Sequence, residues 1–254
     1  VGTVCETAAE AVAGADLVVL CVPVGAMGEA ARELAPALAS HAVISDVGSS
    51  KQSVARALAE ALPGHTVIPA HPVAGTEQSG PDAGFSTLFH QRWCILTPAP
   101  DAPAAAVADL TALWESLGAK VEIMDPAHHD VVLAVTSHIP HLIAYTIVGT
   151  ASDLEDVTQS EVIKYSAGGF RDFTRIAASD PTMWRDVFLS NREAVLEVLG
   201  RFSEDLTALQ RAIRNGDGET LFDLFSRTRM IRRSIIEQGQ DDARPDFGRE
   251  HGEA

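Results

Sequence analysis

Four stretches of this chain combine side chains that could carry out chemistry, and the first is 71–77. It holds His71, a glycine, Thr76 and Glu77, and it follows the apolar run 66–70, which we predict to be a buried strand. A neutral imidazole can take up a proton near pH 7, so His71 could be a general base or a hydrogen-bond acceptor. A structural histidine at a strand end is the alternative for His71. Glu77 could either close a pocket or be solvated.

The second stretch, 46–51, joins the end of a predicted strand to the start of a predicted helix. Backbone N–H groups at such a junction can face an anion or a carboxamide, and Ser49 adds a hydroxyl. A serine at this position is also a common helix cap, so these residues leave both interpretations open.

The third stretch, 137–141, places His138 and His141 on one helix face with Pro140 between them. Proline in a helix interior costs roughly 3 kcal/mol, so we expect a compensating contact or a kink that serves a purpose. His128 and His129 lie nearby, but the chain has neither an HExxH motif nor a cysteine cluster, and we expect no metal site. The pair could line a substrate pocket or have a structural or interface role.

Arginines mark the fourth stretch, 168–177, in which Arg171 and Arg175 are four residues apart. The planar guanidinium group suits two-point binding of a carboxylate. Gly169, one of two adjacent glycines, would allow the backbone to approach a ligand closely. A surface ion-pair network with neighbouring aspartates is the alternative interpretation.

Strands and helices alternate in the first half of the predicted secondary structure. We predict strands at 16–23, 42–46, 66–70, 93–97 and 120–124, and helices at 7–13, 26–39, 51–62 and 104–117. This alternation favours a parallel, doubly wound sheet, in which ligands bind at the carboxyl edge. After residue 125 we predict only helices, at 126–152, 180–215 and 219–238.

The composition excludes several classes of partner and compartment. The 254 residues are 46% hydrophobic and 21% charged, as in globular proteins, and no apolar run approaches the roughly 20 residues that span a bilayer. A net charge of −16 argues against nucleic-acid and anionic-membrane partners. The three scattered cysteines favour free thiols in a reducing compartment, so we expect a cytoplasmic protein.

Together the four stretches resemble the prephenate dehydrogenase family, which includes arogenate and cyclohexadienyl dehydrogenases. The matching segments are Asp-Val-Gly-Ser-Ser-Lys, His-Pro-Val-Ala-Gly-Thr-Glu, Ser-His-Ile-Pro-His, Gly-Gly-Phe-Arg-Asp-Phe-Thr-Arg-Ile-Ala and Asp-Pro-Thr-Met-Trp-Arg, in this order over nearly the whole chain. The resemblance implies an α/β fold: a partial Rossmann-type parallel sheet domain at 1–125, then an all-helical dimerisation domain at 126–240. It also implies a homodimer. The Asp, Arg, Pro and Gly content after Gly239 predicts a flexible tail at 241–254.

The resemblance further implies oxidative decarboxylation of prephenate with NAD or NADP, giving 4-hydroxyphenylpyruvate and CO2, or of arogenate, giving tyrosine. His71 would accept the proton of the ring hydroxyl, Ser49 would bind that hydroxyl and the nicotinamide, and Arg175 would bind a substrate carboxylate. The rest of the substrate pocket would comprise His138, His141, Thr76, Glu77, Gly169 and Arg171. The cofactor would also contact Val22, Pro23 and Asp46.

The glycine-rich phosphate loop of this family does not occur in the sequence, because no G-x-G-x-x-G is present. We expect that loop, and the acidic residue that reads the ribose, to lie upstream of Val1, so that the chain is truncated at its start. If the chain is complete, the alternative is a non-catalytic relic that binds prephenate or tyrosine. Another dehydrogenase of related build, acting on a hydroxyacid or an imine, is disfavoured by the pairing of His71 with Arg175.

Overall fold

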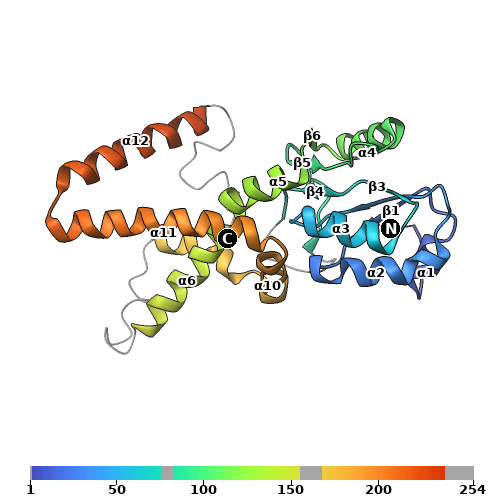
Figure 1. Cartoon of the computed structure of the whole chain (residues 1–254), viewed down its shortest axis with the longest axis horizontal. Coiled ribbons are helices and arrows are strands. Elements are labelled where there is room, and N and C mark those ends of the chain that lie inside the picture. Colours follow the sequence, from blue (N-terminus) through green and yellow to red (C-terminus); the bar gives the residue numbers. More distant parts are fainter. Residues whose placement is uncertain (1, 76–79, 81–82, 155–167, 238–254) are drawn as a thin grey trace, which may run out of the picture. The chain divides into compact units, whose positions relative to one another are not determined.

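The computed structural model describes residues 2–75, 80, 83–154 and 168–237. Thr76, Glu77 and the predicted tail 241–254 lie outside the described residues. The chain divides into two compact units, Val1–Val198 and Leu199–Ala254. The described strands all belong to the first unit and end at Ile123 (Figure 1).

The first sheet consists of three parallel strands in the order β1 (Leu17–Leu20), β2 (Val43–Asp46) and β3 (Thr66–Val67). Its helices are α1 (Ala8–Val12), α2 (Met27–Leu34) and α3 (Gln52–Ala61), of which α2 and α3 pack side by side (Figure 1). Two short 3-10 helices, η1 (Val24–Ala26) and η2 (Ala35–Ala37), flank α2. The apolar faces of these elements leave water together and form a core that includes Leu20, Met27, Ile44 and Leu58.

The second sheet contains β4 (Ala70–Pro72), β5 (Trp93–Leu96) and β6 (Lys120–Ile123), and α4 (Ala104–Ser116) packs against β6. Strands β5 and β6 are parallel, whereas β4 runs antiparallel to β5 and places His71 opposite Ile95. The core of this part includes Ile68, Leu96, Leu110 and Trp114.

Pro69 divides the predicted strand 66–70 into β3 and β4. Ile68 still donates its N–H to a carbonyl of β2 at 2.8 Å, but the carbonyl of Pro69 accepts from Thr97 N–H at 2.8 Å. Proline has no N–H to continue the first ladder, so the chain changes partners here. The prediction that His71 follows the end of a strand was therefore wrong, because His71 lies within β4.

Helices alone follow Ile123 in the described part of the chain. The first is a continuous helix made of α5 (Pro126–Leu133), the π-helix η4 (Ala134–His138) and α6 (Ile139–Asp153), and Asp125 caps its start. The others are α9 (Gly168–Thr174), the 3-10 helix η5 (Arg175–Ala178), α10 (Pro181–Ser190), α11 (Arg192–Asn215) and α12 (Gly218–Glu237).

Two local features modify the predicted helices. Pro140 is the second residue after the π-helix η4, and this widened turn is the compensation that a proline within a helix requires. The predicted helix 180–215 is instead two helices, α10 and α11, which meet at Asn191. The break lets the Asn191 side chain donate to the carbonyl of Asp130 at 2.7 Å.

The helix Pro126–Asp153 is, among the described helices, the one with the length and composition to cross a membrane. It has 28 residues and a mean hydropathy of 1.7. This qualifies the expectation from the sequence that no apolar stretch is long enough. Core helices of globular proteins meet the same criteria, and this helix buries His129, Asp130 and His138 inside the first unit.

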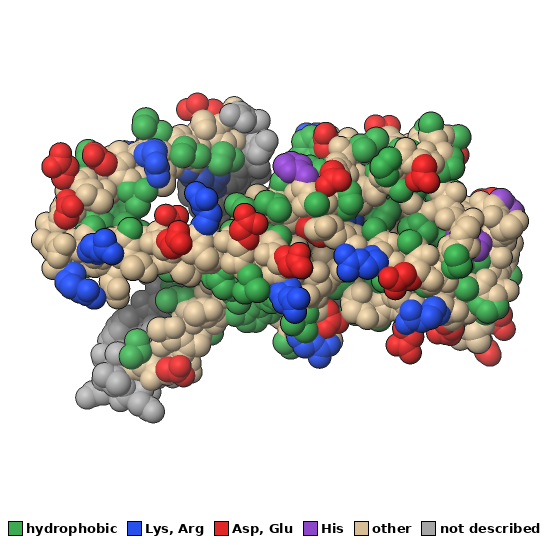
Figure 2. All heavy atoms as spheres, in the orientation of Figure 1, with side chains coloured by type: hydrophobic (Ala, Val, Ile, Leu, Met, Phe, Trp, Pro, Cys, Tyr) green, Lys and Arg blue, Asp and Glu red, His purple; other side chains and the backbone are tan. Residues whose placement is uncertain are grey.

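In the second unit, α12 turns back after α11 at Gly216, which has a φ of +67° that suits glycine (Figure 1). Large apolar side chains are exposed along these two helices (Figure 2): Leu206, Ile213, Phe222, Phe225, Met230 and Ile231. An exposed apolar surface of this kind is typical of a protein–protein interface.

A buried ion pair anchors the loop between β2 and α3. Lys51 Nζ donates to Asp46 Oδ2 at 2.5 Å and to the carbonyl of Ala70 at 2.7 Å, and neither charged side chain is exposed. Asp46 also accepts from the N–H of Gly48 at 2.7 Å and of Ala70 at 3.2 Å. Burial raises the pKa of Asp46 and lowers that of Lys51, and the pairing of the two charges opposes both shifts. The pair thereby ties the end of β2 to β4.

Removing the cation should show how strongly the fold depends on this pair. We expect Lys51→Met to lower the free energy of unfolding by about 3–5 kcal/mol, because Asp46 would remain as a buried, unpaired carboxylate. The double variant Lys51→Met/Asp46→Asn should recover part of that loss. Urea denaturation measures both, with Lys120→Met as a control on the exposed surface. Equal losses for Lys51→Met and the control would contradict the structural role.

Candidate active site

His71 is held in a buried chain of hydrogen bonds that runs from β4 to α5. Its Nδ1 lies 2.9 Å from Nε2 of His129, and Nδ1 of His129 lies 2.9 Å from Oδ1 of Asp130. The two imidazole rings meet edge to face, with centroids 5.1 Å apart. All three side chains are buried, and only 8% of His71 is exposed. The chain thus fixes the orientation of the His71 ring.

Asp130 also caps helix α3 from outside that helix. Its Oδ1 accepts from Lys51 N–H at 2.7 Å, and its Oδ2 accepts from Gln52 N–H at 3.0 Å. These donors follow Ser50 directly, but the cap comes from Asp130 of α5, and neither Ser49 nor Ser50 provides it. Burial alone would raise the pKa of Asp130, but hydrogen bonds from His129 and from these N–H groups outweigh it and lower the pKa. Asp130 is therefore an ionised acceptor.

Asn191 connects the same network to His138. Its Nδ2 donates to the carbonyl of Asp130 at 2.7 Å and lies 3.1 Å from Nδ1 of His138. Because the carbonyl identifies this end of the amide as NH2, Nδ1 of His138 must accept, and a neutral His138 then carries its hydrogen on Nε2. That Nε2 is buried, and a hydrogen bond to the backbone of Ser49 raises the pKa of His138 against the effect of burial. The His138 ring therefore faces the loop that carries Ser49.

The indole ring of Trp184, on α10, contacts the rings of both His138 and His141. It stacks on the ring of His141 at 3.7 Å between centroids and meets that of His138 edge to face at 6.0 Å. The indole Nε1 is a buried donor without a partner in the described part of the chain. A ligand or water can satisfy such a donor.

Arg175 begins η5, which packs against α6. Burial is the main cause of the lowered pKa of His141, and the positive charge of Arg175 lowers it further. The hydroxyl of Tyr145 donates to the carbonyl of Ser179 at 2.7 Å and so holds the segment after η5 against α6. The structure therefore brings Arg175 towards the histidine pair, although 34 residues separate them in sequence.

Burial keeps the imidazoles of this cluster neutral near pH 7. The pKa of His71 is lowered well below its ordinary value, first by burial and then by His129, Lys51 and His138. Burial likewise lowers the pKa of His138 to about 4 and outweighs the neighbouring Asp130 carboxylate, which raises it. Burial lowers the pKa of His129 despite its hydrogen bond to Asp130. Neutral imidazoles can accept a proton.

The cofactor side of the candidate site is the carboxyl edge of β1 and β2. These parallel strands pair Leu20 with Asp46, so the residues that follow them, Val22 and Pro23 after β1 and Ser49 after β2, leave the same edge. Gly48 is needed in this loop, because a Cβ there would lie 2.7 Å from Val24 Cγ1. A dinucleotide binds at this edge in folds of this type.

The predicted site residues differ in how far the structure accounts for them. His71, His138 and His141 lie in one cluster, with Arg175 close to His141. Asp46 is fully buried and paired with Lys51, so its contact with a cofactor stays a prediction. Gly169 and Arg171 are exposed on α9, and no contact with the cluster is described for them. No cluster of metal-binding side chains occurs within the described residues.

Four residues of the network were not predicted as site residues: Lys51, His129, Asp130 and Asn191. His129 carried the clearest signal, because it lies four residues before the buried Leu133 on the inner face of α5. The sequence alone could not distinguish it from the exposed His128 as a partner of His71. That contact joins residues 58 positions apart in the chain.

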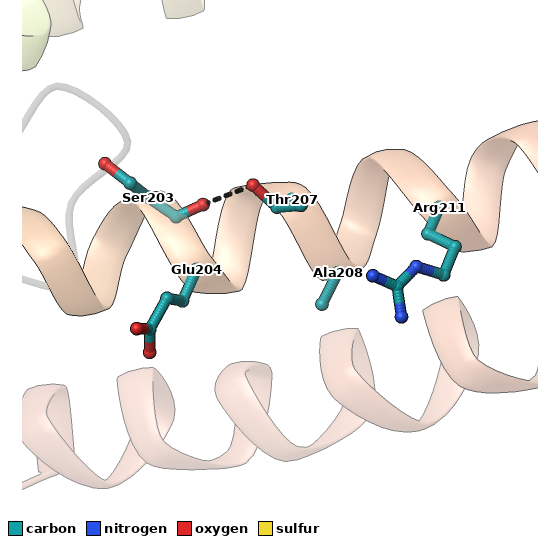
Figure 3. A pocket seen from close by; sticks show the side chains of 5 residues that line it. All are labelled: Ser203, Glu204, Thr207, Ala208 and Arg211. Carbon is teal, nitrogen blue, oxygen red and sulfur yellow. Dashed lines mark hydrogen bonds between the residues drawn. The ribbon is translucent and has the colours of Figure 1, made fainter.

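Two surface hollows are lined by residues other than the histidines of the cluster. One, of about 270 Å³, adjoins the network and is lined in part by Asp130, Ser190 and Asn191. The other, of about 370 Å³, is lined by one face of α11 in the second unit (Figure 3): Ser203, Glu204, Thr207, Ala208 and Arg211. Neither contains the histidines of the cluster, so neither is the candidate active site.

Comparison with known proteins identifies both halves of the chain. The model for the nucleotide-binding domain of prephenate dehydrogenase matches residues 1–123, and the model for its dimerization domain matches residues 125–227. These matches and the described elements confirm the predicted fold class, a Rossmann-type sheet domain followed by a helical dimerisation domain. The predicted boundaries at 125 and 240 stay predictions.

Individual relatives agree with this assignment. Cyclohexadienyl dehydrogenase of Zymomonas mobilis is 47% identical over 226 residues, which are 89% of this chain and 77% of that protein. Prephenate dehydrogenase of Bacillus subtilis is 35% identical over 210 residues, 82% of this chain and 56% of that protein. The crystal structure of prephenate dehydrogenase from A. aeolicus with hydroxyphenyl propionate and NAD+ has a TM-score of 0.81 at 35% identity, covering 87% of this chain and 76% of that one. The chain therefore belongs to the prephenate dehydrogenase family.

Proposed function

We propose that the protein oxidatively decarboxylates prephenate to 4-hydroxyphenylpyruvate and CO2 with NAD or NADP, as a step of tyrosine biosynthesis. The buried, oriented imidazole of His71 carries this proposal, because the reaction needs an acceptor for the proton of the ring hydroxyl. The names of the relatives from Bacillus subtilis and Zymomonas mobilis support the same chemistry.

His71 acts on the hydroxyl of the substrate ring. As hydride leaves the hydroxyl-bearing carbon and the ring carboxylate departs as CO2, the ring becomes aromatic. His71 holds the hydroxyl proton during this step and returns it to the phenol oxygen of the product, so no net proton is released. Ser49 orients the same hydroxyl. General-base help of this kind is typically worth about 10²–10⁴-fold in rate.

The substrate carboxylate and side chain would face the donors of the helical part. Arg175 binds a carboxylate, and the N–H group of Trp184, which has no partner among the described residues, is available to the anionic substrate. His141, stacked on Trp184, lines the same pocket. Thr76, Glu77, Gly169 and Arg171 complete the pocket in this proposal.

The residues present fit the nicotinamide end of the cofactor. Val22, Pro23 and Ser49 lie at the carboxyl edge where a nicotinamide would bind, and Asp46 holds that loop in place. NAD or NADP, when bound there, supplies the acceptor for the hydride. The 254 residues contain no G-x-G-x-x-G, so no residue is proposed for the pyrophosphate.

Action on arogenate is the second candidate, alone or together with prephenate. The 47% identity to a cyclohexadienyl dehydrogenase favours it. We also propose a homodimer formed through 126–240, supported by the dimerization-domain match and by the exposed apolar side chains of α11 and α12. A cytoplasmic location, without nucleic-acid or membrane partners, completes the proposal and is based on the charge and cysteine content.

Formation of NADH and NADPH by the full-length protein, with prephenate and with arogenate as substrates, tests the function. Turnover with prephenate supports the proposal, and the four combinations establish both preferences. Absence of turnover in all four, with tyrosine or prephenate still bound in calorimetry, would support the non-catalytic relic instead.

Replacing the proposed base should separate catalysis from binding. We expect His71→Asn to lower kcat by about 10²–10⁴-fold with little change in the KM for prephenate, because the proton acceptor is lost and the carboxylate contacts remain. Steady-state kinetics measure this, with His41→Asn on the exposed surface as the matched control. An unchanged kcat would remove His71 from the reaction.

Loss of Arg175, the proposed partner of the substrate carboxylate, should weaken substrate binding and so raise KM, whereas loss of His71 should lower kcat. We expect Arg175→Ala to raise the KM for prephenate by about 10- to 10²-fold, the value of a charged hydrogen bond, and to leave binding of NAD+ nearly unchanged. The control is Arg32→Ala, an exposed arginine on α2. If the KM stays at the wild-type value, Arg175 does not contact the substrate.

The pH dependence should reflect the lowered pKa of His71. Only the neutral imidazole is active, and its pKa lies well below 6.5 because of burial and the charges of His129, Lys51 and His138. We therefore expect kcat/KM to stay level as the pH falls from about 8 to 6.5 and to decline only at lower pH. A pH–rate profile measures this. A midpoint at or above 6.5 would contradict the role of a buried His71.

A further inference from the structure

The hydrogen bonds around His71 determine which of its nitrogens carries the hydrogen. Asp130 is the fixed end of the chain, because an ionised carboxylate can only accept. Its Oδ1 therefore accepts from Nδ1 of His129, which lies 2.9 Å away. A neutral His129 with its hydrogen on Nδ1 has a lone pair on Nε2. That Nε2 in turn can only accept from Nδ1 of His71, 2.9 Å away.

We propose that His129 is a positioning residue that holds His71 in the tautomer with its hydrogen on Nδ1 and leaves Nε2 of His71 as the proton acceptor. The proposal rests on the proposed function for the identity of the substrate hydroxyl. The direction of the two hydrogen bonds follows from these contacts together with an ionised Asp130 and a neutral His129. The reverse direction would require a protonated Asp130 that donates to His129.

Asp130 is suited to this task because other contacts keep it in place. Lys51 N–H and Gln52 N–H donate to its two oxygens, and its own carbonyl accepts from Asn191. His129 is 0% exposed and Asp130 is 1% exposed, so water does not compete for these bonds. The arrangement also stays intact during the reaction. When Nε2 of His71 takes up a proton, Nδ1–H continues to donate to His129 and no group has to turn.

The same network gives His138 the opposite tautomer. Asn191 donates to Nδ1 of His138, so this ring presents an N–H at Nε2, whereas His71 presents a lone pair. One buried network thus supplies an acceptor at His71 and a donor at His138. An exposed pair of histidines would exchange between tautomers and would offer neither group reliably.

Nitrogen NMR of protein labelled with 15N-histidine tests the proposal directly. The full-length wild-type protein should show His71 with a protonated Nδ1 and an unprotonated Nε2, with the His71 signals assigned by their absence in His71→Asn. In His129→Phe, which keeps a ring in the buried space, the form with hydrogen on Nε2 should become populated. His129→Gln keeps an acceptor for Nδ1–H and should retain more of the wild-type tautomer. His128→Phe, at the exposed neighbouring position, should leave it unchanged.

Kinetics of the same variants give the second measurement. We expect His129→Phe to lower kcat by about 10- to 10²-fold with the KM for prephenate within about 2-fold of wild type. The kcat of His129→Gln should lie between those of the wild type and of His129→Phe. A wild-type His71 with its hydrogen on Nε2, or an unchanged tautomer in His129→Phe, would overturn the proposal even if kcat falls. If NMR shows the expected tautomers but the protein oxidises neither prephenate nor arogenate, the role of His129 is supported and the proposed function is rejected.

Discussion

The buried carboxylate of Asp130 is the group on which the arrangement of the site depends. Donors from other segments of the first unit must reach it, and the hydrogen bonds they make hold those segments in place. A buried charge is costly unless it is paired or hydrogen-bonded. Asp130 lies on α5 and is 1% exposed, and its donors come from the start of α3 and from its neighbour His129. Asp130 therefore helps to connect the sheet domain to the helix that follows it, together with the hydrogen bond between His71 and His129, and it places the Ser49 loop and the imidazole of His71 relative to one another.

A second acid, Asp46, does the corresponding work within the sheet. With Lys51 it joins the end of β2 to β4, so the strand that carries His71 is connected to the loop that carries Ser49. Asp46, Asp130 and Lys51 carry the charges near the active site. Burial keeps the imidazoles of His71 and His138 beside them neutral. These three charges thus belong to the supporting structure, and the imidazoles offered to a substrate are neutral. Hydrogen bonds between such groups are strong where water is excluded.

Sequence reasoning predicted groups that could act and largely missed those that hold them. His71, His138, His141 and Arg175 stand in short segments of unusual composition, and their roles stay predictions. The alternation of strands and helices predicted the carboxyl edge of the sheet, which Val22, Pro23 and Ser49 follow. Pro69 changed the pairing of its strand, and this could not be foreseen because the new partner, β5, follows only after residue 92. His129 and Asn191 act through contacts between distant segments, and no local pattern marks such a contact.

The π-helix before Pro140 fixes the number of residues between Asp130 and His138. A π turn accommodates one residue more than an α turn, and each residue of an α-helix advances the chain by about 100° around the axis. The extra residue is thus absorbed without turning the α-helical residues on either side, whereas a further residue inserted before His138 would rotate His138 by about that angle relative to Asp130. Asn191 could then no longer reach both partners. In evolution, this stretch should therefore accept changes of side chain far more readily than a change of length.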